Sequence, residues 1–192
     1  MQIQVDRLTS TPTPFVFELG SGWWREHMSP ERGLPREVAR PFAVRVSAHE
    51  MGDDLYLEGG ISGEIELECS RCLARYRHPL QESFRLVLEP AGAREPADPE
   101  AREALARDGL CLLDEFETGW YRGREIHLDC VAQEVISLAL PVKPLCREDC
   151  AGLCSRCGAD WNQGPCGCAE IDHKSHFAVL AALRGGDTEG AR

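Results

Sequence analysis

The sequence contains no hydrophobic run that could cross a membrane and no excess of positive charge. Its longest uncharged apolar run, residues 135–142, has eight residues, whereas a spanning helix needs roughly 20. Residues 1–13 are polar and lack the apolar stretch of a signal peptide. The formal net charge of −11 excludes a general nucleic-acid coat protein, which needs positive charge over its surface. We therefore expect a soluble, cytoplasmic protein without a membrane partner.

Motifs of common enzymes are also missing. The sequence has no glycine-rich loop for phosphates, no nucleophile motif, and no carboxylate–histidine cluster at metal-ligand spacing. It has no internal repeat and no helix rich in arginine and lysine, as a DNA-binding regulator would need. We therefore expect neither an enzyme nor a small-molecule substrate. With 192 residues, of which 43% are hydrophobic, the chain can nevertheless bury a substantial core.

Hydrophobic and polar residues alternate between Arg40 and Leu88. This period of two predicts an antiparallel β-meander with one apolar and one polar face. Turns are expected at residues 52–54 and 58–60. Two shorter extended segments, 3–5 and 15–19, come before the meander, and residues 20–24 are expected to turn the chain. Of the two tryptophans in this turn, we expect one in the core and one at its rim.

Residues 89–109 differ in composition, with three prolines, six alanines and a single leucine. They predict a mobile acidic loop outside the core that carries one short exposed helix. Asp98 would be its N-cap, Pro99 its first residue, and Gly109 would follow its end. Strands are expected beyond this loop, at residues 110–116 and 125–128.

A further helix is predicted over residues 130–140, ended by Pro141. Asp129 would cap it. Its apolar face would consist of Val131, Val135, Leu138 and Ala139. Another short helix is expected at residues 175–183.

These elements predict an α+β fold, in which one or two helices pack on an antiparallel β-meander sheet and a cysteine-rich, zinc-ribbon-like segment follows. The expected organisation is a β-rich domain at residues 1–140 and a cysteine-rich segment packed on it at 141–172. A short helix and tail would complete the chain at 173–192.

Ten cysteines in a cytoplasmic protein are poor candidates for disulfides, because that compartment keeps thiols reduced. Eight of them are spaced closely enough for pairs to reach one ion, as structural zinc requires. These candidate ligands are Cys69, Cys72, Cys146, Cys150, Cys154, Cys157, Cys166 and Cys168. The sequence therefore predicts one or two Zn²⁺ ions.

The compact division of these ligands gives two sites. One consists of the last four cysteines, within a local ribbon of 15 residues, and the other joins Cys69 and Cys72 to Cys146 and Cys150. A single site with a leftover set is the alternative. A redox pair at Cys69 and Cys72 is another, although redox thiolates usually lie at a helix N-terminus and this pair follows a strand.

The other potential ligands look less suitable. Cys111 and Cys130 have no nearby partner and are expected to be buried free thiols. His173 and His176 could substitute as ligands, but we expect them on the surface.

A local basic patch could still contact RNA. If the first site joins its two segments, seven basic residues converge near it, with acidic residues interleaved. They are Arg71, Arg75, Arg77, Arg85, Lys143, Arg147 and Arg156. A solvated, partly ion-paired surface is the alternative interpretation.

The cysteine-containing segments resemble the YceD family. The resemblance rests on ECSRCL at residues 68–73, LALPV at 138–142, LCREDCAGLCSRCG at 145–158 and FAVLAAL at 177–183. It covers roughly residues 61–183. One departure is Asp172-His173-Lys174, where many relatives have Asp-Pro-Arg.

This resemblance implies a bacterial, non-catalytic factor that supports accumulation of 23S ribosomal RNA and assembly of the large ribosomal subunit. The expected partner is 23S rRNA or a pre-ribosomal particle. A basic ribosomal protein is an alternative partner, because the acidic chain would attract it. A thiol-based redox sensor is the alternative function.

Overall fold

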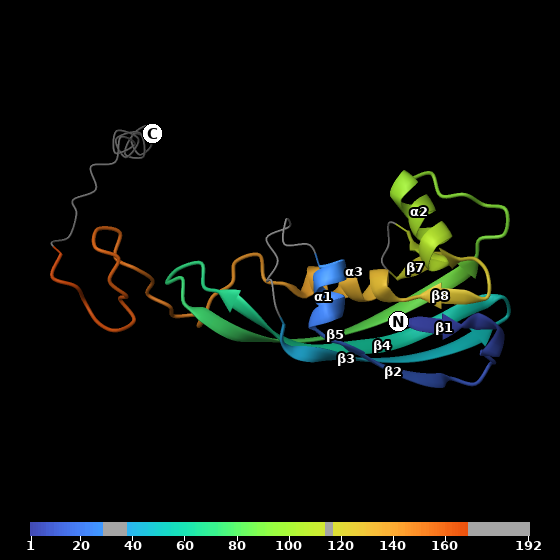
Figure 1. Ribbon diagram of the computed structural model, residues 1–192, viewed down its shortest axis with the longest axis horizontal. Helices are drawn as coiled ribbons and strands as arrows, with labels where there is room; N and C mark the ends of the chain where they lie inside the picture. The colour runs from blue at the N-terminus through green and yellow to red at the C-terminus, as the bar shows by residue number, and fades with distance from the viewer. Residues whose placement is uncertain (29–37, 114–116, 169–192) are drawn as a thin grey trace, which may run out of the picture.

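A six-stranded sheet is the main element of the computed structural model, which describes residues 1–28, 38–113 and 117–168 (Figure 1). Its neighbours are antiparallel except for one parallel pair, β5 with β7. In spatial order the strands are β2 (Thr13–Leu19), β3 (Val38–Met51), β4 (Asp54–Glu68), β5 (Arg75–Pro90), β7 (Thr118–Tyr121) and β6 (Leu110–Leu112). The predicted meander, β3 to β5, is confirmed. Strand β7 was not predicted, because it is too short for a clear alternation.

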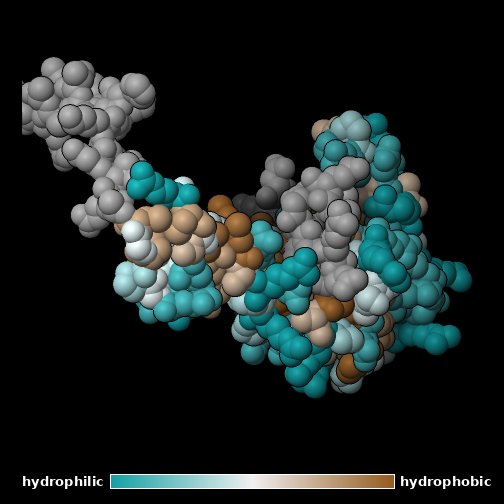
Figure 2. Space-filling view, turned by 60° about the vertical axis from the view of Figure 1, so that its left-hand side comes forward, coloured by the Kyte–Doolittle hydropathy of each residue, from teal (hydrophilic) through white to brown (hydrophobic). Residues whose placement is uncertain are grey.

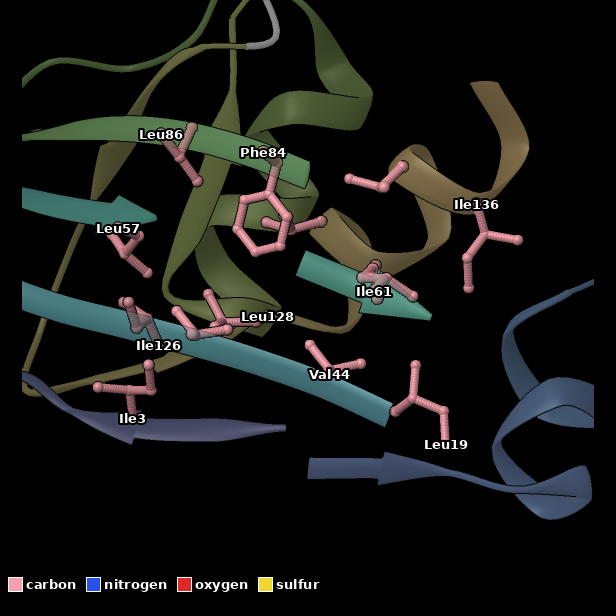
Figure 3. Packing of buried hydrophobic residues seen from close by; sticks show 14 of the residues in the cluster. Ile3, Leu19, Val44, Leu57, Ile61, Phe84, Leu86, Ile126, Leu128 and Ile136 are labelled. Atoms are coloured by element: carbon pink, nitrogen blue, oxygen red, sulfur yellow. The ribbon is translucent and has the colours of Figure 1, made fainter. Parts of the chain in front are cut away.

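One face of the sheet is covered. The short helix α1 (Ser21–His27), helix α3 (Asp129–Ala139) and a two-stranded sheet lie over it (Figure 1). The small sheet pairs β1 (Gln2–Gln4) with β8 (Glu125–His127), and the 3-10 turn η1 (Val5–Arg7) directly follows β1. Figure 3 shows Ile136 of α3 facing Ile61 and Phe84 of the large sheet. The opposite face carries exposed polar side chains such as Glu58 and Arg85. None of the helices in the described ranges is long and apolar enough to cross a membrane.

Residues 58–60 do not form the expected turn, because β4 continues through them. Gly59 lies opposite Phe84 on β5, and a Cβ at Gly59 would be 2.7 Å from the Phe84 ring and from the Arg45 carbonyl oxygen. A Cβ at Gly63 would similarly be 2.5 Å from the Phe42 ring. These glycines make room for aromatic rings of neighbouring strands instead of reversing the chain.

Residues 20–24 also differ from the prediction, since they enter α1 instead of a turn. Trp24 is buried with its ring stacked on Phe42, whereas Trp23 is half-buried, as expected for one core and one rim residue. The indole Nε1 of Trp23 donates to Asp129 Oδ1 at 2.7 Å.

Asp129 does not cap helix α3, because it is the first helical residue and Leu128 occupies the cap position. Its carboxylate instead accepts from Trp23 and pairs with the Met1 amino group at 2.7 Å. Burial raises the pKa of Asp129, but these two donors outweigh it and lower the pKa below its usual value. Leu138 was wrongly placed on the buried face: it is 67% exposed, and Ala132 and Ile136 are buried in its place.

The acidic segment does contain the predicted helix, α2 (Pro99–Asp108). The Asp98 carboxylate accepts from the Ala101 N–H at 2.8 Å, and Gly109 ends the helix with φ of 70°. The segment is not wholly outside a core, however, because Leu105 is buried against Ala91 and Cys111. The predicted strand at 110–116 is shorter than expected, ending at Leu112. Residues 114–116 and the predicted helix at 175–183 lie outside the described residues.

We expect Gly63→Ala to lower the free energy of unfolding by about 1–3 kcal/mol, because its methyl group would overlap the buried Phe42 ring. Chemical denaturation measures this change. Gly60→Ala is the matched control on the same strand. Its Cβ would meet only the Glu82 carbonyl oxygen, at 3.3 Å. Equal effects of the two substitutions would contradict the packing role of Gly63.

Candidate metal centres

The structure gathers the eight closely spaced cysteines into two groups of four, the same two as in the compact division of the sequence. In each group the four sulfur atoms lie within 4.8 Å of one another. The first tetrad consists of Cys69, Cys72, Cys146 and Cys150, and the second of Cys154, Cys157, Cys166 and Cys168. Cys111 is buried in β6 and Cys130 is half-buried in α3, both outside the tetrads. His173 and His176 lie outside the described residues.

The first tetrad lies at the tip of the β4–β5 hairpin. Cys69 follows β4 directly, and the chain beyond α3 returns to this tip, where the Ser70 N–H donates to the Pro144 carbonyl at 2.8 Å (Figure 1). The sulfur atoms of Cys69 and Cys150 are 3.7 Å apart, as are those of Cys72 and Cys146. The tetrad therefore joins segments that are more than 70 residues apart in the sequence.

The two tetrads begin with nearly identical loops, CSRCLA at residues 69–74 and CSRCGA at 154–159. In each loop the N–H of the first cysteine donates to the carbonyl of the final alanine, at 2.9 Å and 2.8 Å. The fifth residue donates back to the carbonyl of the first cysteine, at 2.9 Å in both loops. The arginine N–H points at the sulfur of the first cysteine, at 3.5 Å and 3.4 Å. Nearly the same local sequence therefore forms the same hydrogen-bonded knuckle twice, and each knuckle supplies two cysteines of a tetrad.

The knuckles differ at their fifth residue, which must adopt a left-handed backbone conformation. Gly158 does so with φ of 73°, whereas Leu73 has φ of 58°. This conformation costs a side-chain-bearing residue about 1–2 kcal/mol. Leu73 is 58% exposed, so burial of its side chain repays only part of this cost. The first knuckle therefore stores backbone strain that glycine avoids in the second.

One thiol in each tetrad is poised to ionise. Burial raises the pKa of Cys69, but backbone N–H groups of Cys146, Cys72 and Arg71 outweigh it and lower the pKa to about 6. The Trp161 indole, together with the backbone of Cys168, lowers the pKa of Cys166 to about 6.

Another thiol in each tetrad holds its proton. Burial and neighbouring thiols raise the pKa of Cys146 to about 12. Hydrogen bonding with Cys157, followed by burial, raises the pKa of Cys168 to about 12. Four thiolates cannot coexist at this separation unless a cation neutralises them. A bound divalent ion would supply that neutralisation and displace the remaining protons.

The tetrads fit a structural zinc ion. Zn–S bonds of about 2.3 Å in a tetrahedron place the sulfurs roughly 3.8 Å apart, close to the 3.7 Å of two sulfur pairs in the first tetrad. In both tetrads all four sulfurs lie within 4.8 Å of one another. Within the described ranges, no histidine or carboxylate joins either group. Each site would therefore be closed, with four protein ligands and no position left for a substrate.

Most of the basic residues predicted to contact RNA form hydrogen bonds or ion pairs within the protein. Arg71 donates to the carbonyls of Cys150 at 2.8 Å and Glu148 at 3.4 Å. Arg75 pairs with Glu66, and Arg147 with Asp149. Arg71 therefore links the first knuckle to the segment that carries Cys150, whereas Arg75 and Arg147 form ion pairs on the surface.

The prediction that Arg85 converges on the first tetrad is wrong. Arg85 lies ten residues beyond Arg75 along the extended strand β5 and pairs with Glu58 at 3.0 Å. At about 3.3 Å per residue, it lies roughly 33 Å away from Arg75. Exposed Arg77, Lys143 and Arg156 make no side-chain ion pair or hydrogen bond with any other described residue.

We expect Cys69→Ser to destabilise the fold more than Cys166→Ser. The first change opens a link between the sheet and the chain beyond α3, whereas the second opens a local loop. At saturating zinc, each variant should bind one ion fewer, and Cys69→Ser should lose more than about 2 kcal/mol of unfolding free energy. Thermal melts with metal analysis measure both effects.

Cys130→Ser is the control, because this half-buried thiol belongs to neither tetrad and its loss should leave the metal content unchanged. Equal destabilisation by Cys69→Ser and Cys166→Ser would contradict the division into a long-range and a local centre.

Comparison with known proteins identifies relatives over most of the chain. Residues 57–184 match the family model described as large ribosomal RNA subunit accumulation protein YceD. The chloroplastic large ribosomal RNA subunit accumulation protein YCED homolog 1 of Arabidopsis thaliana is 23% identical over 156 residues, which cover 75% of this chain and 49% of that protein. An uncharacterized protein of Mycobacterium leprae is 24% identical over 123 residues, covering 64% of this chain and 50% of the relative.

The chain thus spans about half the length of the curated relatives it matches. No solved structure matches it closely. The family match includes strand β5, helix α3 and all eight cysteines of the two tetrads. On this evidence, the chain belongs to the YceD family of large ribosomal RNA subunit accumulation proteins.

Proposed function

We propose that the protein is a non-catalytic factor that supports accumulation of 23S rRNA, and that two structural zinc ions hold together its RNA-contacting end. The observation that carries this proposal is the position of both cysteine tetrads inside the region that matches the family model. The protein would act in the compartment where the large ribosomal subunit assembles.

The ligand sets support a structural role for the metal. Four thiolates select zinc or iron–sulfur chemistry among the common metals. Catalytic zinc keeps an open coordination position, which a closed set of four cysteines does not provide. The ions would therefore organise a binding surface instead of activating water or a substrate.

The charge distribution favours a confined RNA contact. The chain carries a net charge of −11, so most of its surface repels phosphate. Arg77 on β5, Lys143 beside the first tetrad and Arg156 in the second knuckle are exposed basic side chains. They belong to the cysteine-bearing end of the protein, which forms a smaller lobe beside the main body (Figure 2). We propose that these three side chains contact rRNA phosphates there.

A basic ribosomal protein is the second candidate partner. The observation that favours it is the engagement of Arg71, Arg75 and Arg147 within the protein, which leaves the acidic character of the chain dominant. An acidic surface would attract such a protein before it reaches its RNA site.

Charge reversal separates these candidates. The combined substitutions Arg77→Glu, Lys143→Glu and Arg156→Glu should weaken association with large-subunit precursor particles by about tenfold, because several phosphate contacts would be lost. They should also lower 23S rRNA relative to 16S rRNA in cells that depend on this protein. Gradient sedimentation and rRNA quantification give the two readouts.

The matched control reverses Arg40, Arg45 and Arg85, which changes the net charge equally on strands β3 and β5. This control should retain particle association. Equal loss in both triple variants would show a general charge effect and contradict the proposed RNA contact. Unchanged RNA association together with tighter binding of a basic ribosomal protein would favour the second candidate.

A further inference from the structure

Two consecutive side chains each donate a hydrogen bond to a different tetrad. The indole Nε1 of Trp161 donates to Cys166 Sγ of the second tetrad at 3.5 Å. The amide Nδ2 of Asn162 donates to Cys150 Sγ of the first tetrad, also at 3.5 Å. Both residues belong to the loop between Cys157 and Cys166, two ligands of the second tetrad. This loop therefore contacts the ligands of both centres.

The orientation of Asn162 is fixed by its other partners. Its Oδ1 accepts from the Arg147 guanidinium at 2.6 Å and from the Ala151 N–H at 2.8 Å. Its Nδ2 also donates to Asp160 Oδ1 at 2.7 Å. Because two donors address the amide oxygen, the amide nitrogen must face Cys150. The other hydrogen bonds of Asn162 therefore fix the orientation in which its amide donates to the sulfur.

Backbone hydrogen bonds also connect the segments that carry the two tetrads. The Leu153 N–H donates to the carbonyl of Arg71, in the first knuckle, at 3.2 Å. The Trp161 N–H donates to the Gly152 carbonyl at 2.9 Å. Gly152 has φ of 80°, and a Cβ there would be 3.1 Å from the Arg71 carbonyl oxygen. The chain that enters the second centre therefore packs directly against the first knuckle.

We propose that the two tetrads take up metal as one coupled unit, with Trp161 and Asn162 as the coupling element. This inference rests on the proposal that both tetrads hold zinc. Hydrogen bonds to ligating sulfurs strengthen metal binding, and loss of such an outer contact typically costs 10–100-fold in affinity.

The direction of the coupling follows from where the loop is anchored. Metal in the second tetrad fixes both ends of the loop, at Cys157 and Cys166, and so presents the Asn162 amide to Cys150. Metal in the first tetrad fixes Cys150 and, through it, the loop. By linkage, each ion raises the affinity for the other by the same factor.

The test follows the occupancy of each tetrad separately. Cysteine alkylation at buffered free Zn²⁺, read by mass spectrometry, gives the free Zn²⁺ concentration that half-protects the first tetrad. In the double variant Cys166→Ser/Cys168→Ser, this midpoint should be about tenfold higher than in the unmodified protein. Asn162→Leu should raise it similarly, and combining all three substitutions should add little further.

Gln163→Leu is the matched control, since this neighbouring side chain donates to Asp160 and not to a sulfur. It should retain the original midpoint. An unchanged midpoint in the Cys166→Ser/Cys168→Ser variant, or additive losses in the combined variant, would overturn the coupling. Either result would leave the proposed zinc-dependent function intact, whereas failure of Zn²⁺ to protect either tetrad would overturn both.

Discussion

At the tip of the β4–β5 hairpin, cysteine sulfurs take the place of a hydrophobic core. The cluster there contains three buried residues, Cys69, Cys72 and Cys150, with Tyr76 and Leu145 partly buried against it. Such a cluster is too small to order two long-range segments by hydrophobic burial alone. Metal binding would supply that stabilisation, since the free energy of coordination becomes folding free energy. The position of the second tetrad depends on this first link through the contacts of Leu153 and Asn162.

The grouping of the eight cysteines was the most predictable part of the structure, because a site for one ion requires four ligands whose pairs are closely spaced in the sequence. The meander was also predictable, since hydrophobic residues of its buried face alternate with polar residues along each strand. Glycines 59 and 63 show what alternation cannot reveal: their role depends on aromatic rings from other strands. The role of Asp129 as a helix cap was mispredicted for a similar reason: its partners, Trp23 and the Met1 amino group, are more than 100 residues away in the sequence. The position of Arg85 was mispredicted because residues ten apart in the sequence lie far apart in space along an extended strand.

The arginines at corresponding positions of the two similar knuckles have different surroundings. Arg71 uses its guanidinium to hold the carbonyls of Glu148 and Cys150, which fastens the first centre. The corresponding Arg156 is exposed and is one of the basic side chains proposed to contact RNA. The repeated motif therefore has a structural contact in one copy, and its arginine is exposed and available for the proposed RNA contact in the other. The sequence did not reveal the contacts of Arg71 or the hydrogen bond from Asn162 to Cys150, because both depend on how the two cysteine loops pack together.

Metal content per chain tests the central claim most directly. Protein purified without chelator should contain two zinc ions per chain. Under conditions that unfold the sheet but leave the ions bound, only Cys111 and Cys130 should react with a thiol reagent. After chelation, all ten cysteines should react. Protein without metal, or with the tetrad cysteines joined in disulfides, would contradict the account that zinc holds this end of the molecule together.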